Sequence, residues 1–181
     1  TLDYLTGKYR EPRLHQVTLE LGANMLMLGG LYNDKASAVA ALEHSLSSGK
    51  AAEIFAKMVS ALGGPADLIE KPLQYLATAP VVQDITAPQT GYLQYQDTVG
   101  LGMAVVRLGG GRSHPSQQID PAVGFSHILA AGQPVQQGEV IAKVHAANPE
   151  AAKLAATEYL QALLIQPQTV PAFPLVHHTI G

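Results

Sequence analysis

The chain is organised around one stretch, Asp97-Thr-Val-Gly-Leu-Gly-Met-Ala-Val-Val-Arg-Leu-Gly-Gly-Gly-Arg112. Its middle, Met103 to Leu108, is mostly apolar and compatible with a strand, and glycines flank it on both sides. This pattern predicts a buried strand over residues 102–108 with a turn at each end. The polar segment that follows, up to Gln118, is expected to be mobile because three glycines order poorly and nothing apolar anchors it.

Around this stretch, the chain after Pro80 has the composition of short strands separated by Pro, Gly, Asn or Asp. The other predicted strands are residues 81–85, 91–96, 123–129 and 140–145. Their regular short spacing favours a small barrel or sandwich over a parallel sheet with crossover helices. Asn148 and Pro149 then predict the start of a last helix, and prolines at 167, 171 and 174 predict an extended tail. The expected apolar face of that helix comprises Leu154, Ala155, Leu160, Leu163 and Leu164.

Before Pro80, the apolar residues recur at helical spacing. Three helices are predicted to begin at Pro12, Asp34 and Lys50, and each ends before a glycine. Each helix is short and amphipathic, so its apolar face must pack on its neighbours and on something larger. The face expected on the first helix comprises Leu14, Val17, Leu21, Met25 and Leu28. Residues 65–79 are expected to form a helical turn and irregular chain.

Composition limits the classes of protein that this sequence represents. At 181 residues the chain has room for one good core, or for a helical half and a β half that share one. The formal net charge of -3 gives no field that attracts nucleic acid or an anionic membrane, so we expect neither as a partner. The sequence has no cysteine, and no run approaches the roughly 18 apolar residues of a membrane span. We therefore expect a soluble, cytoplasmic protein.

The glycine-rich segment Gly109, Gly110, Gly111 and Arg112 is the main candidate for a functional site. Backbone amides and a guanidinium in this order are compatible with an anion cradle. The segment is neither a Walker motif nor a dinucleotide fingerprint, because no Gly-Lys-Ser/Thr follows and no helix opens after it. A flexible loop is therefore the favoured interpretation over a primary phosphate cradle.

The histidines do not predict a metal site. His177 and His178 are neighbours in a segment expected to be extended, where adjacent side chains face opposite sides. Single histidines at 114, 127 and 145 have no recognisable partner in the sequence, so surface or strand-packing roles are favoured for them. No bound metal is expected.

Residues 131–144, Ala-Gly-Gln-Pro-Val-Gln-Gln-Gly-Glu-Val-Ile-Ala-Lys-Val, are similar to a half-motif of biotinyl and lipoyl carrier domains. Gly132 and Gly138 provide tight turns, while Val135 and Val140 fill a small barrel. A carrier needs its modified lysine at an exposed hairpin tip, but Lys143 lies within a strand-like alternation. The barrel architecture therefore remains an expectation, while a carrier function is disfavoured.

Several segments taken together resemble the C-terminal part of the thymidine phosphorylase family. They are Leu5-Thr-Gly-Lys-Tyr-Arg-Glu-Pro-Arg-Leu14, Ser48-Gly-Lys-Ala-Ala-Glu-Ile-Phe-Ala-Lys-Met-Val59, Gly63-Gly-Pro65, Asp97-Thr98, Leu101-Gly-Met-Ala-Val-Val106, Gly109-Gly-Gly-Arg112, Ile119-Asp120 and Val123-Gly-Phe125. Their order and spacing agree along nearly the whole chain, although Val99 stands where the family often has a basic residue. The resemblance implies an α+β fold. Residues 1–79 would be a helical part of the family's large α/β domain, and residues 80–181 a barrel-sandwich-like, hammerhead-type β module with a C-terminal helix.

The resemblance also implies an activity, the reversible phosphorolysis of thymidine to thymine and 2-deoxyribose 1-phosphate in pyrimidine nucleoside salvage. Such enzymes are homodimeric pentosyltransferases that use inorganic phosphate as a co-substrate and no organic cofactor. Their phosphate and base ligands lie upstream of the part represented here, so no catalytic residue is assigned, and this chain alone is expected to be inactive without its N-terminal portion. Gly109, Gly110, Gly111 and Arg112 are expected to form a loop that helps close the site over its substrates. A biotinyl- or lipoyl-like carrier and a structural interaction domain are the alternatives.

Overall fold

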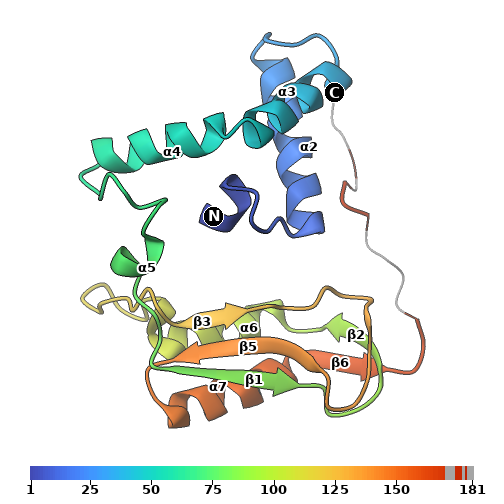
Figure 1. Ribbon diagram of the computed structural model, residues 1–181. Helices are drawn as coiled ribbons and strands as arrows, with labels where there is room; N and C mark the ends of the chain where they lie inside the picture. The colour runs from blue at the N-terminus through green and yellow to red at the C-terminus, as the bar shows by residue number, and fades with distance from the viewer. Residues whose placement is uncertain (170–173, 177, 179–181) are drawn as a thin grey trace. The chain divides into compact units, whose positions relative to one another are not determined.

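The computed structural model describes residues 1–169, 174–176 and 178. Contacts divide the chain into two compact units, one formed by Thr1–Tyr75 with the described part of the tail from Pro174, and the other beginning at Leu76 (Figure 1). Within the described residues, no helix has both the length and the apolar character needed to cross a membrane. Of the predicted extended tail, residues 170–173, 177 and 179–181 lie outside the described part of the chain.

The first unit is helical. Its elements are α1 (Leu2–Leu5), α2 (Pro12–Leu28), α3 (Lys35–Ser47), α4 (Lys50–Ala61) and α5 (Pro72–Tyr75). The three predicted helices are confirmed, and their starts follow the local signals. Pro12 occupies the first turn of α2 behind the Glu11 cap, and the Asp34 carboxylate accepts a hydrogen bond from the Ser37 amide at 2.9 Å. Helix starts were predictable because a cap involves only neighbouring residues.

Small residues bring α2 and α3 together. Ala23 and Ala38 are fully buried, and a β-carbon on Gly22 would lie 2.9 Å from Leu42 Cδ1. Most of the predicted apolar face of α2 is exposed in the described part of the chain, since Leu21, Met25 and Leu28 are 60%, 72% and 90% exposed. This unit therefore carries an apolar surface that its own helices leave open.

The second unit combines helices with two antiparallel sheets of three strands each, which confirms the α+β class. One sheet has the order β1-β5-β3, formed by Val81–Thr86, Val140–Ala146 and Gly124–Ser126. The other has the order β4-β2-β6, formed by Pro134–Val135, Gly91–Tyr95 and Leu163–Gln166. The helix α7 (Pro149–Gln161) packs on β1 and β5 and contacts α6 (Thr98–Val105) and the following turn η1 (Val106–Gly110) (Figure 1).

The prediction of a strand over residues 102–108 is wrong, because this segment forms α6 and η1. The Asp97 carboxylate caps the helix by accepting a hydrogen bond from the Gly100 amide at 2.7 Å. Ala104 and Leu108, four residues apart, are both buried, which is the spacing of one helical face. An apolar run of this length fits either period, and packing against α7 favours the helical one.

The last helix begins at Pro149 behind the Asn148 cap, as predicted, but it ends earlier than expected. The prediction that Leu163 and Leu164 belong to its apolar face is wrong, because both residues lie in β6. Leu163 and Ile165 are buried and Leu164 is exposed, so the burial alternates as in a strand that pairs with β2. The helix instead buries Tyr159, while Leu154 is 56% exposed. The two-residue strand β4 was not predicted.

The core of the second unit is centred on Tyr159, Leu93, Ile141 and Val144, the largest fully buried side chains. The Tyr95 hydroxyl donates to the Leu129 carbonyl at 2.7 Å and lies 2.9 Å from the Tyr159 hydroxyl. Burial raises the pKa of both phenols, and the hydrogen bond with Tyr95 adds to the rise at Tyr159. Both hydroxyls are therefore neutral hydrogen-bonding groups of the core at physiological pH.

Candidate functional site

The predicted site residues lie where η1 opens into a surface loop. Gly109 and Gly110 are the last residues of η1, and Gly111 follows in extended conformation. Gly109 has φ of 101°, a left-handed conformation that side chains rarely adopt. A β-carbon on Gly110 would lie 2.9 Å from Val105 Cγ1, and one on Gly111 would lie 2.8 Å from Val106 Cγ2. The glycines are therefore required by close packing and backbone geometry at this turn.

The loop after the glycines has more internal order than its composition predicts. Gln117 organises it, because its side-chain carbonyl accepts hydrogen bonds from the Ser113 amide at 2.9 Å and the Ser113 hydroxyl at 2.7 Å. Arg112 Nε donates a hydrogen bond to the backbone carbonyl of Gln117 at 3.1 Å. At the base of the loop, the Asp120 amide donates to the Gly109 carbonyl at 2.9 Å. Hydrogen bonds therefore order this loop although its sequence contains little apolar surface.

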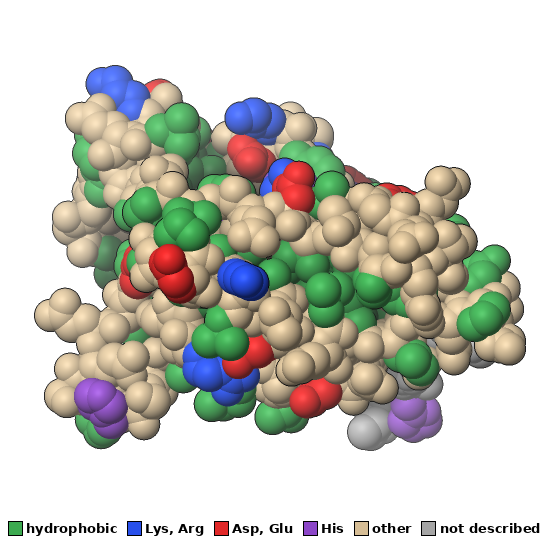
Figure 2. Space-filling view, turned by 90° about the horizontal axis from the view of Figure 1, so that it is seen from below, with side chains coloured by type: hydrophobic (Ala, Val, Ile, Leu, Met, Phe, Trp, Pro, Cys, Tyr) green, Lys and Arg blue, Asp and Glu red, His purple; other side chains and the backbone are tan. Residues whose placement is uncertain are grey.

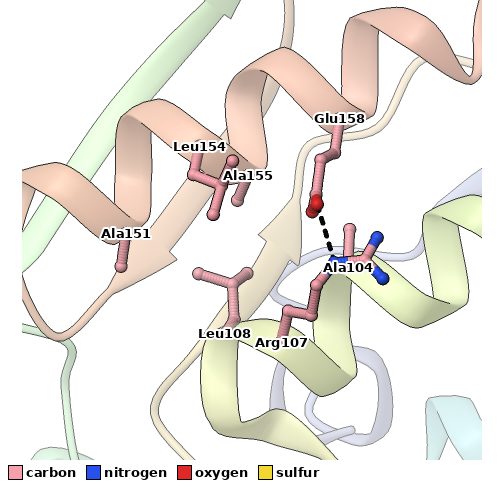
Figure 3. Close-up of a pocket in the computed structure, with 7 residues that line it drawn as sticks. All are labelled: Ala104, Arg107, Leu108, Ala151, Leu154, Ala155 and Glu158. Atoms are coloured by element: carbon pink, nitrogen blue, oxygen red, sulfur yellow. Dashed lines mark ion pairs between the residues drawn. The ribbon is translucent and has the colours of Figure 1, made fainter.

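Two residues that were not singled out from the sequence hold the helix leading into this loop. Arg107 Nε donates to Glu158 Oε1 of α7 at 2.6 Å, and both flank a small hollow (Figure 3). The hollow is otherwise lined by Ala104, Leu108, Ala151, Leu154 and Ala155. Its volume of about 30 Å³ is far below that of a ligand pocket, so it is not a substrate site. The sequence contains one indication of this contact. Glu158 is an acidic residue on the same helical face as the small apolar residues Ala151 and Ala155, where a buried charge needs a partner.

A larger hollow of about 490 Å³ lies beside the β4-β2-β6 sheet. It is lined by Thr90, Gly91, Tyr92, Pro134, Val135, Gln136, Glu139 and Pro167. The charged group in this lining is the Glu139 carboxylate, which accepts a hydrogen bond from the Gln136 amide at 2.8 Å. A carboxylate repels anions, so this lining is unsuited to phosphate. On the face drawn in Figure 2, Lys and Arg side chains lie singly or beside acidic ones, without gathering in one patch.

The structure brings together two histidines that the sequence left apart. Ser126 Oγ lies 2.7 Å from His145 Nε2 and 3.0 Å from His127 Nδ1. No group of three or more His, Cys, Asp or Glu suited to a metal ion occurs among the described residues, so this pair lacks a third ligand. His114 lies in the loop, with Nδ1 3.0 Å from Ser116 Oγ, and His177 falls outside the described residues.

Lys143 does not occupy a carrier-type position. It lies within β5, opposite Asp84 of β1, and its Nζ donates to Asp84 Oδ1 at 2.5 Å. A lysine that is modified in a carrier domain must be presented at a hairpin tip, whereas this one is held on the surface of a sheet. The two turns predicted at Gly132 and Gly138, which precede β5 in the chain, are confirmed. Their φ angles are 85° and 86°.

The sequence of this chain was compared with models of protein families and with known proteins, and both comparisons agree on one family. Residues 92–166 match the pyrimidine nucleoside phosphorylase C-terminal domain. The chain is 45% identical over 180 residues to a thymidine phosphorylase of Burkholderia orbicola, an alignment that covers 99% of this chain and 41% of that protein. It is 42% identical over 177 residues to a thymidine phosphorylase of Colwellia psychrerythraea, covering 98% of this chain and 40% of that protein. The chain therefore spans about two fifths of the length of these relatives.

Proposed function

Because the chain belongs to the thymidine phosphorylase family, as a C-terminal portion, we propose that the whole protein catalyses the reversible phosphorolysis of thymidine. The observation that carries this proposal is the 45% identity along 99% of the chain to a thymidine phosphorylase. In this reaction, a phosphate oxygen bonds to C1′ of deoxyribose while the bond from C1′ to the base nitrogen breaks. The base takes up a proton, and the products are thymine and 2-deoxyribose 1-phosphate.

In this proposal, the chain has a structural role in the enzyme. The residues that bind phosphate and base belong to the portion of the protein upstream of it. The linings of the two hollows described above support this division for the described residues, because one hollow is too small for a substrate and the other presents a carboxylate. Charge develops on the sugar and on the departing base, so the reaction depends on groups positioned around them. We place those groups outside this chain.

The proposed architecture follows the same division. Residues 1–79 would complete the large α/β domain of the enzyme, and residues 80–181 would form a barrel-sandwich-like module of the hammerhead type. The open apolar face of α2, with Leu21, Met25 and Leu28, supports a covering partner, which we take to be the N-terminal portion of the same protein. The complete enzyme would be a cytoplasmic homodimer in pyrimidine nucleoside salvage, with inorganic phosphate as co-substrate and no organic cofactor.

Within this enzyme, Gly109, Gly110, Gly111 and Arg112 would form a lid element that orders the closed site without supplying the main phosphate ligands. Two features of the loop support this role. The glycine at position 109 already has a left-handed backbone, and Arg112 is exposed at the start of the loop. A cation at this place favours a closed state that contains anionic phosphate.

The full-length protein tests the proposed function through thymine release from thymidine at saturating phosphate. We expect turnover from the complete protein and none from the verified 181-residue chain. Phosphate-dependent release is the distinguishing feature, so a reaction without phosphate is the control. Turnover by the 181-residue chain alone would contradict the division of roles, and an inactive, folded full-length protein would contradict the proposed reaction.

A further inference from the structure

The ion pair between Arg107 and Glu158 joins the segment that enters the glycine loop to the last helix. Arg107 is the second residue of η1, and Glu158 lies in the last turn of α7. Figure 3 shows the side chains of Arg107 and Glu158 pointing toward each other. The distance from Arg107 Nε to Glu158 Oε1 is 2.6 Å. The Glu158 side chain is 18% exposed and that of Arg107 46%. The carboxylate is thus the more buried partner.

Apolar surroundings make Glu158 dependent on its arginine. The side chains beside it in the hollow are alanines and leucines, and its Oε2 has no hydrogen-bond partner among the described residues. A carboxylate that is largely removed from water loses more when its cationic partner is deleted than an exposed one does. This pair therefore holds the two helices in one arrangement more firmly than a surface pair would.

The same segment contains the backbone turn at Gly109 from which the loop starts, here called the hinge. Gly109, with its left-handed backbone, lies two residues after Arg107, and its carbonyl accepts the Asp120 amide that closes the loop. Gly109 is the residue of η1 whose backbone is not helical, and a left-handed glycine at this place ends the helical chain in the way that helices commonly end. The ion pair fixes the chain on the entry side of the hinge, and the Asp120 hydrogen bond fixes it on the exit side.

We propose that Arg107 and Glu158 are positioning residues, whose ion pair holds the hinge at Gly109 so that the loop over residues 109–118 is presented in the orientation needed for turnover. The kinetic part of this inference rests on the proposed phosphorylase activity. The structural part does not, because it concerns only the order of the loop.

Hydrogen exchange of the full-length protein measures the structural part. The variants are Glu158→Gln, Arg107→Met, the double variant, and the charge exchange Arg107→Glu with Glu158→Arg. Asp84→Asn is the matched control, since it breaks the ion pair with Lys143 in the same unit without touching the loop. We expect amides of residues 109–118 to exchange faster in each single variant, on the order of tenfold, and the double variant to be no worse than either. The charge exchange should restore most of the protection, and the control should leave it unchanged.

Kinetics of the same variants measure the second part. We expect turnover to fall on the order of tenfold in the single variants while the KM for phosphate stays near that of the wild type. Unchanged exchange in the loop, an equal rise in exchange throughout the unit, or unchanged turnover would each overturn the inference. If Glu158→Gln does not fold, the conservative variant Arg107→Lys and the charge exchange still test whether the ion pair controls hydrogen exchange in the loop and turnover. A folded wild-type protein without phosphorolytic activity would overturn the proposed function, and the exchange data would still show whether the pair holds the loop.

Discussion

At the level of single residues, two glycines close together in sequence have opposite physical requirements. Gly109 has a left-handed backbone, whereas Gly102 lies inside α6, where a β-carbon would meet nothing within 4 Å. The first position needs a residue without a β-carbon, and the second only lacks the stabilisation that alanine brings to a helix.

We therefore expect opposite effects of alanine at these positions. Gly109→Ala should lower the free energy of unfolding by about 1–2 kcal/mol, because left-handed backbone is strained for alanine. Gly102→Ala should raise it by about 0.5–1 kcal/mol. Urea unfolding of the full-length protein checks both, and a stabilising Gly109→Ala would show that the hinge does not require this backbone.

The buried tyrosine pair predicts a loss of stability in alkali. Burial raises the pKa of Tyr95 and of Tyr159 above the ordinary value of 10.0. Their contribution to stability is therefore complete below the unfolded pKa of about 10 and is lost as the pH rises above it, because the unfolded chain releases these protons more readily. Thermal unfolding followed between neutral pH and pH values above about 10 should show this fall.

The matched variant for this test is Tyr95→Phe with Tyr159→Phe. Removing both hydroxyls should flatten the alkaline fall in stability relative to the wild type, although it also removes the hydrogen bond to Leu129. Tyr9→Phe is the control, since Tyr9 is 64% exposed and should leave the alkaline fall unchanged. If the stability of the Tyr95→Phe, Tyr159→Phe variant falls as steeply in alkali as that of the wild type, then other ionisable groups cause the fall.

At the level of elements, the loop over residues 109–118 combines a packed entry with a body that side-chain hydrogen bonds organise. Its entry is helical and packed, whereas its body depends on Gln117 and Arg112. Such a loop can change its arrangement by exchanging a few hydrogen bonds, while its base stays in place.

Two changes in the full-length protein test the loop as a lid. Arg112→Ala, and separately a shortening of Ser113 to Gln118, should reduce turnover while leaving the KM for phosphate near normal, because the proposed lid orders the closed state without binding phosphate directly. Steady-state kinetics with thymidine and phosphate varied in turn are the measurement. Lys153→Ala, at an exposed position of α7 outside the loop, is the control. If both loop variants keep wild-type turnover and both Michaelis constants, the lid role has no support.

At the level of the whole molecule, the helical unit leaves apolar surface uncovered. Leu21, Met25 and Leu28 of α2 are more than half exposed, and so are Ile54 and Leu62. Exposed apolar area of this kind favours association with another surface.

The 181-residue chain should therefore self-associate, or bind the N-terminal portion of the protein when that portion is added. Sedimentation at increasing concentration and binding of a hydrophobic dye measure the first behaviour. Replacing Met25 and Leu28 by Glu should reduce both signals, whereas Leu73→Glu, at an exposed position outside this helix face, should not. Monomeric behaviour at high concentration without dye binding would contradict this expectation.

The sequence alone determined the features that depend on neighbouring residues. The starts of α2, α3 and α7 follow from Pro12, Asp34 and Asn148, because caps and first-turn prolines act within a few residues. The strands β1, β2 and β5 follow from β-favouring residues between turn formers. The resemblance to the family followed from the order and spacing of short segments, which an alignment along the whole chain confirms.

Features that depend on partners distant in the chain follow from packing and are visible in the folded protein. The apolar run at 103–108 fits a strand or a helix by composition, and the contact with α7 selects the helix. Leu163 to Gln166 leave the helical pattern because β2 supplies backbone partners for them. Arg107 of η1 and Glu158 of α7 meet only when these two elements pack. The sequence of α7 shows an acidic residue on a face of small apolar residues, but it does not show which residue pairs with it. Local rules specify where elements begin, whereas packing determines which of two compatible conformations a segment adopts, because most of the stabilisation comes from the surface buried against the partner.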